Sequence, residues 1–189
     1  MRVLIAEDEA LIRMDLREML EEEGHEVVGE ARDGAEAIAL ARETRPDIVF
    51  MDVKMPNVDG IEAARTISEE SIAPVVMLTA FSQASLVEDA AKAGAMGYVV
   101  KPFSRNDLFP AMQVAASRYA ELAALEQQVG DLNERLETRK LLDRAKGILM
   151  AAGLTEPDAF KRLQKLAMDK RKSLREVAEA VITAEELKS

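Results

Sequence analysis

Short apolar runs alternate with amphipathic stretches along the first 120 residues. The stretches between the runs carry apolar residues three and four positions apart, as at Leu16, Met19 and Leu20. Five apolar runs separated by helical patterns are typical of parallel strands buried on both faces. In chain order, the runs are RVLIA, EVVGE, DIVFM, PVVML and GYVVK. The pattern therefore predicts an α/β fold, a doubly wound five-stranded parallel sheet covered by helices on both sides.

The chain after Pro110 predicts one long helix, because no glycine–proline linker interrupts it. Between residues 113 and 137 this helix carries apolar residues spaced three and four apart, with Glu and Gln beside them. These residues are Leu122, Leu125, Val129, Leu132 and Leu136. Such a stripe is the a/d pattern of a coiled coil, here about two heptads long. It would serve equally for packing within the chain, and both interpretations stay open.

Two further helix starts follow the long helix. Thr155 precedes Asp158, and Ser173 precedes Glu176, by the three positions of a capping box. Apolar residues on one face of each helix predict a small all-α domain with a three-helix core. The expected core positions are Leu141, Leu142, Ala145, Ile148, Leu149 and Ala152, then Ala159, Phe160, Leu163, Leu166 and Ala167, then Leu174, Val177, Ala178, Val181 and Ile182.

Charge is distributed unevenly along this acidic chain, whose net charge is −10. Residues 1–137 hold 13 basic and 27 acidic residues, whereas residues 138–175 hold 11 basic and 4 acidic ones. A basic block on an acidic protein suggests that this segment meets a polyanion, although a solvated helical surface is the simpler alternative. No cysteine is present, and neither a signal peptide nor a membrane span is evident, so we expect a soluble, cytoplasmic protein without a membrane partner.

Polar residues with complementary chemistry end the predicted strands. Glu7 and Asp8 follow the first run, Asp52 the third, Thr79 the fourth and Lys101 the fifth. The carboxyl ends of parallel strands meet at one edge of the sheet, where ligands of such folds bind. Three carboxylates gathered there call for a hard cation such as Mg²⁺. A hydroxyl and an ammonium beside them would complement a phosphoryl group, whose transfer depends on positioning and charge neutralisation.

These motifs resemble the receiver domain of two-component response regulators over residues 1–120. The matching segments are AEDEALIR, FMDVKMPNVDG, VVMLTA and GYVVKPF. The resemblance implies a flavodoxin-like, CheY-like fold and phosphorylation by a sensor histidine kinase. The roles it implies are a phosphoacceptor at Asp52, an Mg²⁺ site formed by Glu7, Asp8, Asp52 and the backbone carbonyl of Lys54, phosphoryl contacts from Thr79 and Lys101, and a switch rotamer at Tyr98. It also implies a cis peptide bond before Pro102, and we expect Phe81 to lie beside the phosphoryl site.

The segment DRAKGILM, residues 143–150, places unusual residues on the outer side of the long helix. At about 100° per residue, the predicted core positions share one arc, and Arg139, Lys140, Arg144 and Lys146 lie on its flanks. Met150 points away from the core, with Gly147 beside it. An outward methionine next to a helix-weakening glycine, surrounded by cations, indicates a surface that meets an anionic and partly flat partner.

Residues 126–186 resemble the ANTAR domain, an RNA-binding antitermination module, through RAKGILM, EPDAF, LAMD and SLREVAEAVI. The resemblance implies a regulator that binds paired hairpin loops in leader RNA, prevents a terminator from forming, and commonly acts as a dimer. The expected RNA contacts are Lys140, Arg144, Ala145, Lys146, Gly147 and Met150, with Lys170, Arg171, Lys172 and Arg175 as a second cluster. Because Phe160, the only aromatic residue of this module, is expected to be buried, bases would stack on Arg and Met.

Two other functions remain open from the sequence. Three helices with basic residues could form a DNA-binding regulator related to helix-turn-helix proteins. The long helix could also serve an adaptor that dimerises and binds only protein. An enzyme is not expected beyond the receiver's own phosphoryl transfer and dephosphorylation, because no second cluster of acid, base or nucleophile is evident.

Overall fold

The structure, a computed structural model, describes residues 1–80 and 84–187. The chain divides into two compact units, Met1–Ala123 and Ala124–Ser189. The boundary between the units falls inside one long helix, α5 (Arg105–Ala151). Among the described helices, none is both long and apolar enough to cross a membrane.

The first unit contains a five-stranded parallel sheet with strand order β2-β1-β3-β4-β5. The strands match the five apolar runs, so the predicted sheet is confirmed. Strands and helices alternate along the chain as β1 (Arg2–Ala6), α1 (Ala10–Glu22), β2 (Glu26–Ala31), α2 (Gly34–Thr44), β3 (Ile48–Asp52), α3 (Gly60–Glu69), β4 (Val75–Thr79), α4 (Ala84–Lys92), β5 (Gly97–Val100) and α5.

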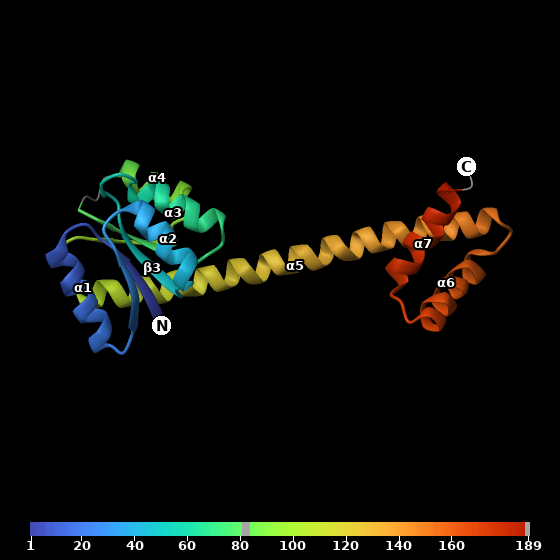
Figure 1. Cartoon of the computed structure of the whole chain (residues 1–189), viewed down its shortest axis with the longest axis horizontal. Helices are drawn as coiled ribbons and strands as arrows, with labels where there is room; N and C mark the ends of the chain where they lie inside the picture. The colour runs from blue at the N-terminus through green and yellow to red at the C-terminus, as the bar shows by residue number, and fades with distance from the viewer. Residues whose placement is uncertain (81–83, 188–189) are drawn as a thin grey trace. The chain divides into compact units, whose positions relative to one another are not determined.

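Helices cover both faces of this sheet (Figure 1). On one face, Leu16 and Leu20 of α1 and Leu108 of α5 pack with Phe50 of β3. On the other face, α2 and α3 present mainly small residues, and Ile67 is the largest fully buried side chain that they contribute. All five residues of β3 are buried, which explains why the central run reads as continuously apolar until Asp52.

Helix α5 begins earlier than the sequence predicted. It starts at Arg105, and Pro110 lies inside it rather than before it. Ser104 stabilises this start, because its backbone N–H and hydroxyl both donate to the Asp107 carboxylate, at 2.9 and 2.7 Å. The apolar stripe predicted between residues 113 and 137 lies along the middle of α5. Its five side chains are 43–57% exposed, so none of the described residues covers the stripe.

The second unit consists of the end of α5 with α6 (Glu156–Lys170) and α7 (Leu174–Glu186). Both predicted caps are confirmed: Thr155 accepts a hydrogen bond from the backbone of Asp158, and Ser173 forms a complete capping box with Glu176. The three helices share an apolar core as expected. Its fully or nearly buried members are Ala145, Leu163, Ala167, Val177, Ala178 and Ile182.

Two expected members of this core are corrected. Phe160 is 37% exposed, and Ala152 is exposed as well. The neighbouring Ala159 is fully buried and takes the inward position at the start of α6. Since successive helical residues point about 100° apart, the ring of Phe160 falls at the edge of the core instead of inside it.

Candidate functional site

Three carboxyl groups converge at the carboxyl edge of the sheet. Glu7 and Asp8 follow β1, and Asp52 ends β3, its neighbour in the sheet. One carboxylate oxygen from each of them lies within 4.8 Å of the other two. Beside them is a hollow of about 180 Å³, whose lining includes Asp8, Asp52, Lys54, Thr79 and Lys101. The sheet thus brings together the residues that the strand ends predicted.

Lys101 faces two of these carboxylates. Its Nζ atom lies 2.6 Å from Oε2 of Glu7 and 3.0 Å from Oδ1 of Asp52. The backbone N–H of Lys101 donates to the carbonyl oxygen of Thr79, at 2.7 Å. The peptide bond between Lys101 and Pro102 is cis, which confirms the sequence expectation.

Burial dominates the electrostatics of this site. It raises the pKa of Asp52 and of Glu7 above their ordinary values, and the Lys101 ammonium only partly opposes the effect. Burial also acts to lower the pKa of Lys101, but hydrogen bonds to Glu7 and Asp52 outweigh it, so that pKa is raised. One ammonium therefore balances three carboxyl groups incompletely. Oxygen ligands with excess negative charge fit a hard divalent cation.

The outer surface of α5 in the second unit has the composition that the sequence indicated. At about 100° per residue, Lys140, Arg144, Gly147 and Met150 fall in one arc. Met150 is 44% exposed, and a Cβ atom built on Gly147 would have no neighbour within 4 Å among the described residues. No packing inside this unit therefore requires a glycine at position 147.

Several cations on this surface are paired with carboxylates of the same unit. Arg144 lies 2.7 Å from Glu186, and Lys146 lies 2.8 Å from Asp143 and 3.0 Å from Glu156. The Lys146 side chain is only 19% exposed, and its hydrogen bonds to Asp143 and then Glu156 raise its pKa. These pairs leave the surface with fewer available cations than its composition suggests.

One expected RNA contact is corrected by burial. Ala145 is fully buried in the core between α5 and α6, so its side chain does not reach a surface that a ligand could touch. Its methyl group belongs to the core that α5 shares with α6 and α7. The motif position is therefore explained by packing within the unit.

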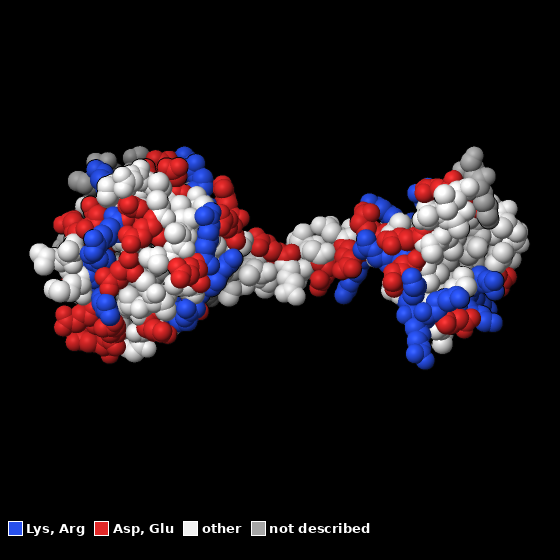
Figure 2. All heavy atoms as spheres, in the orientation of Figure 1, with Lys and Arg blue, Asp and Glu red and all other residues white. Residues whose placement is uncertain are grey.

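The second basic cluster, Lys170, Arg171, Lys172 and Arg175, lies at the end of α6 and the start of α7. Arg175 lies 3.0 Å from Glu179, and Lys172 lies 4.0 Å from Glu176. Within residues 84–187, Lys170 and Arg171 form no ion pair. Lys and Arg side chains also gather over α6 in Figure 2, where the sequence contributes Lys161, Arg162 and Lys165. Sequence reasoning did not single out these three, although they belong to the basic block it recognised.

Two family models match the chain and agree with these two units. Residues 3–113 match the response regulator receiver domain, and residues 130–182 match the ANTAR domain. The chain belongs to the response regulator family. It is therefore a component of a two-component regulatory system, with a receiver domain followed by an ANTAR domain.

Known relatives support the same assignment. The transcriptional regulatory protein PdtaR of Mycobacterium tuberculosis (strain CDC 1551 / Oshkosh) is 63% identical over 182 residues, covering 96% of this chain and 89% of the relative. The chemotaxis protein CheY of Bacillus subtilis (strain 168) is 41% identical over 112 residues, covering 59% of this chain and 93% of the relative. Among solved structures, the response regulator domain of Thermotoga maritima CheB has a TM-score of 0.58 at 31% identity, covering 62% of this chain and 96% of that one.

The receiver domain contains a positioning residue that the sequence did not reveal. Arg13 of α1 is nearly buried, and its Nη1 atom donates to the carbonyl oxygen of Glu7 at 2.6 Å. Its Nε atom donates to the carboxylate of Glu30 at 3.2 Å. Arg13 thus holds the backbone between Glu7 and Asp8. An arginine between Ile12 and Met14 reads as a surface residue, and no sequence signal distinguishes it.

The remaining expected receiver residues have different surroundings. Tyr98 is half-exposed on β5 and lines a hollow with Lys101 and Pro102. Phe81 lies outside the described residues.

Gly60, at the start of α3, packs closely on the site: a Cβ atom built on it would lie 1.8 Å from the carbonyl oxygen of Asp52. This contact explains the glycine of the motif PNVDG in physical terms.

The raised pKa values of Glu7 and Asp52 predict how stability depends on pH without metal. A carboxyl whose pKa is higher in the folded chain binds more protons when folded, so the free energy of unfolding falls as pH rises from the ordinary values of 3.8 and 4.5 through the raised ones. Asp52→Asn removes one such group. We therefore expect this variant to become increasingly stable relative to the wild type as pH rises.

Urea unfolding of metal-free protein from about pH 4 to about pH 8 measures this difference. Carboxylates far from the site contribute equally to both proteins and cancel in the comparison. Glu7 adds to the difference in the same direction, because the charge of Asp52 helps to raise its pKa. Adding Mg²⁺ should reduce the difference in free energy of unfolding between the variant and the wild type, because Mg²⁺ binding stabilises the folded wild type. A constant difference across the whole pH range would contradict the electrostatic interpretation.

Proposed function

We propose that phosphorylation of Asp52 controls the binding of leader RNA hairpins by the ANTAR domain, and that this binding prevents a transcription terminator from forming. The receiver pocket supports the first part, since it combines an acceptor carboxylate with a cation site. The exposed arc around Gly147 supports the second part. The proposed input is a phosphohistidine of a sensor kinase, and the proposed output is structured RNA in the cytoplasm.

In the proposed phosphorylation, an Oδ atom of Asp52 attacks phosphorus, and the bond between phosphorus and the kinase imidazole nitrogen breaks. Glu7, Asp8, Asp52 and the backbone carbonyl of Lys54 are the groups that would hold Mg²⁺. The cation would neutralise charge on the phosphoryl oxygens. Lys101, already 3.0 Å from Asp52, is placed to contact the transferred group.

Two further receiver residues complete the proposed switch. Thr79 lines the same hollow as Asp52, so its side chain is placed near the phosphoryl group. Tyr98 is half-exposed on β5 beside Lys101, which leaves its side chain room to change rotamer. The transfer itself is the only catalysis that this proposal assigns to the chain.

The observation that carries the RNA proposal is the open space beside Gly147. Glycine weakens a helix by roughly 0.5–1 kcal/mol relative to alanine, yet no described residue occupies the space where a side chain would be. Gly130 of the same helix has a similar open space, so the residues that share the arc of Gly147 are what favours close approach of a ligand there. Lys140, Arg144 and Met150 surround Gly147 on the same arc and would contact phosphates and bases. The cations after α6 would position the RNA backbone, a role that carries no sequence information.

Gly147→Ala should stabilise the folded domain and weaken RNA binding, so the two effects can be measured separately. We expect it to stabilise the ANTAR domain by about 0.5–1 kcal/mol, because alanine favours the helix. We expect it to weaken hairpin RNA binding by about 1–3 kcal/mol, the cost of an extra methyl group in a packed contact. Thermal unfolding and a fluorescence anisotropy titration measure the two effects.

Gly130→Ala is the matched control for this test. Gly130 lies in the same helix, and a Cβ atom there also has no neighbour within 4 Å in the described chain. It should give the same stabilisation without affecting RNA binding. If Gly147→Ala stabilises the domain and binds RNA as tightly as the control, Gly147 does not face the RNA.

A DNA-binding regulator is the second candidate, and the basic surface of α6 is the observation that favours it. Cations in a row on one helix neutralise phosphates of either nucleic acid. Titrating a hairpin RNA and a DNA duplex of equal length at several salt concentrations separates the two functions. Preference for the duplex that survives rising salt would support DNA binding instead.

We further propose that two chains associate through the stripe formed by Leu122, Leu125, Val129, Leu132 and Leu136. These side chains are exposed along α5, and an uncovered a/d stripe gains most from a second copy of the same helix. The double variant Leu125→Ser with Leu132→Ser should therefore shift the protein from dimer to monomer. Sedimentation velocity measures the shift.

Leu11→Ser is the control for the stripe variant. Leu11 is strongly exposed on α1 and lies outside the stripe, so its replacement should leave the association state unchanged. Measurements with and without acetyl phosphate show whether phosphorylation is required for the dimer. A wild type that stays monomeric under both conditions would contradict the proposed interface. It would also contradict the alternative function as an adaptor that dimerises through α5.

A further inference from the structure

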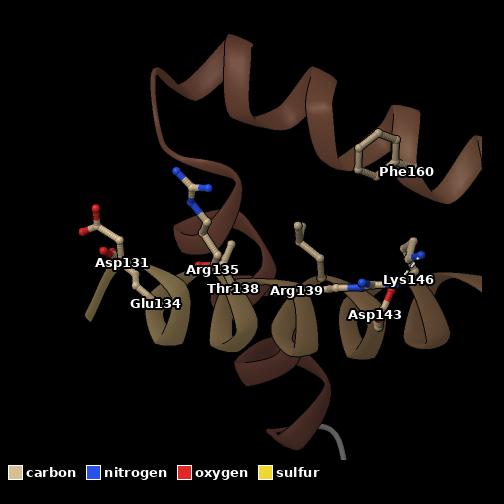
Figure 3. Close-up of a pocket in the computed structure, with 9 residues that line it drawn as sticks. Asp131, Glu134, Arg135, Thr138, Arg139, Asp143, Lys146 and Phe160 are labelled. Carbon is tan, nitrogen blue, oxygen red and sulfur yellow. Dashed lines mark ion pairs between the residues drawn. The ribbon is translucent and has the colours of Figure 1, made fainter. Parts of the chain in front are cut away.

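A groove of about 690 Å³ lies between α5 and α6 in the ANTAR domain. Its lining includes Arg135, Arg139 and Lys146 from α5 and Phe160 from α6 (Figure 3). The volume lies within the roughly 300–1,000 Å³ of sites that hold small organic groups. Arg139 and Lys146 occupy the flank of α5 next to the arc that contains Gly147, so the groove adjoins the proposed RNA surface.

Phe160 lines this groove at the edge of the core and is not one of the buried residues of α6. Ala159, Leu163 and Ala167 fill the buried side of α6, and the ring remains 37% exposed. Figure 3 shows Phe160 on α6 facing the stretch of α5 that carries Arg139, Asp143 and Lys146. An exposed aromatic ring in a concave site offers a flat apolar surface to a ligand.

Three cations and three carboxylates line the groove: Arg135, Arg139 and Lys146, and Asp131, Glu134 and Asp143. Asp143 is paired with Lys146 at 2.8 Å, and Glu134 lies 3.8 Å from Arg175. Within the part of the chain that the structure describes, Arg135 and Arg139 form no ion pair. Arg135 and Arg139 therefore line the groove without a close ion-pair partner, although Asp143 attracts Arg139 at longer range, and guanidinium binds phosphate oxygens well.

We propose that this groove holds one unpaired RNA base against Phe160, with the adjoining phosphate at Arg135 and Arg139. The inference rests on the RNA-binding function proposed above and assigns a specific base-binding site to it. An unstacked nucleotide combines a flat base with an anion a short distance away. RNA loops present such bases to aromatic side chains, whereas the bases of a duplex stay stacked inside it.

The test uses full-length protein and hairpin RNAs that share one stem and carry loops of either adenosines or abasic riboses. Phe160→Leu keeps an apolar side chain and removes the aromatic face. We expect it to raise Kd for the adenosine loop by about fivefold to 100-fold, the range for loss of one stacked base. We expect no change for the abasic loop, and Phe160→Trp should bind the adenosine loop like the wild type.

Arg139→Gln tests the phosphate contact separately. It should weaken binding to both loops and reduce the slope of log Kd against log salt by about one unit. Phe160→Leu should leave that slope unchanged, because stacking releases no counterions. Met168→Ala is the matched control on α6: this side chain is 80% exposed and does not line the groove, so both loops should bind as before.

The outcomes separate this inference from the function on which it rests. If Gly147→Ala weakens hairpin binding but Phe160→Leu does not, the RNA function stands and the base site is wrong. If the wild type binds neither hairpin better than a DNA duplex, the RNA function itself is wrong. If Phe160→Leu lowers the unfolding midpoint and weakens both loops equally, the ring is a packing residue and the proposal is overturned.

Discussion

Asp52→Asn should abolish phosphorylation of the receiver domain by acetyl phosphate and Mg²⁺. The amide keeps the size of the carboxyl group but lacks the nucleophilic oxygen anion, so no acyl phosphate forms. Because Asp52 is buried beside Lys101 and unfavourably charged without metal, the variant should remain folded. Intact-protein mass spectrometry of the two proteins under identical conditions measures the phosphorylated fraction directly.

Asp8→Asn is the informative comparison for this experiment. Asp8 belongs to the same carboxylate cluster but lies at the end of β1, outside the acceptor position. Its replacement should slow phosphorylation, and raising the Mg²⁺ concentration should restore much of the rate. Asp52→Asn should show no such rescue. Uptake by Asp52→Asn at the wild-type rate would assign the acceptor to another residue.

Gly60→Ala should destabilise the receiver domain by about 3–5 kcal/mol, in the upper range for a single substitution. The added Cβ atom would lie 1.8 Å from the carbonyl oxygen of Asp52, and this neighbour is backbone that cannot rotate away. The start of α3 or the end of β3 must therefore move. Either displacement also disturbs the acceptor, so phosphorylation should fall together with the urea midpoint.

Gly97→Ala is the matched control for Gly60→Ala. Gly97 lies in β5 of the same domain, and a Cβ atom there would meet Val76 at 3.8 Å, an ordinary contact distance. The control should unfold within about 0.5–1 kcal/mol of the wild type. Equal urea midpoints for Gly60→Ala and Gly97→Ala would show that the close contact at Asp52 is relieved at little cost.

The receiver domain was predictable because its sequence signals are redundant. Four of the five apolar runs are followed by a polar residue with complementary chemistry, and parallel strands bring such ends to one edge whatever the details of packing. Glu7, Asp52 and Lys101 could therefore be expected near one another. Arg13 could not, because its role depends on the path of the backbone between Glu7 and Asp8, which strand and helix patterns do not specify.

In the ANTAR domain, the spacing of apolar residues does not decide which of two neighbouring residues faces the core. Ala159 and Phe160 are neighbours, and either could face inward within the uncertainty of a helical wheel. Full burial of both Ala145 and Ala159 shows that small side chains face the core on α5 and on α6, which leaves the larger ring at the rim. Hydrophobicity alone favours burying phenylalanine. The structure instead buries Ala159, and which of two neighbouring residues faces inward is set by the tertiary packing of the three helices.

In the RNA binding proposed above, the carboxylates paired with Arg144 and Lys146 would compete with the RNA for these two cations. A phosphate that displaced Glu156 from Lys146 would leave a carboxylate that attracts a cation from solution, and this uptake would partly cancel the ions that the RNA releases. The salt dependence of binding would then undercount a phosphate bound at Lys146, whereas a phosphate bound at Arg135, which forms no ion pair with any described residue, would be counted in full. These carboxylates would also make binding more selective. A polyanion whose shape does not fit the surface would only replace a carboxylate beside each cation with a phosphate, and this exchange would gain little binding free energy.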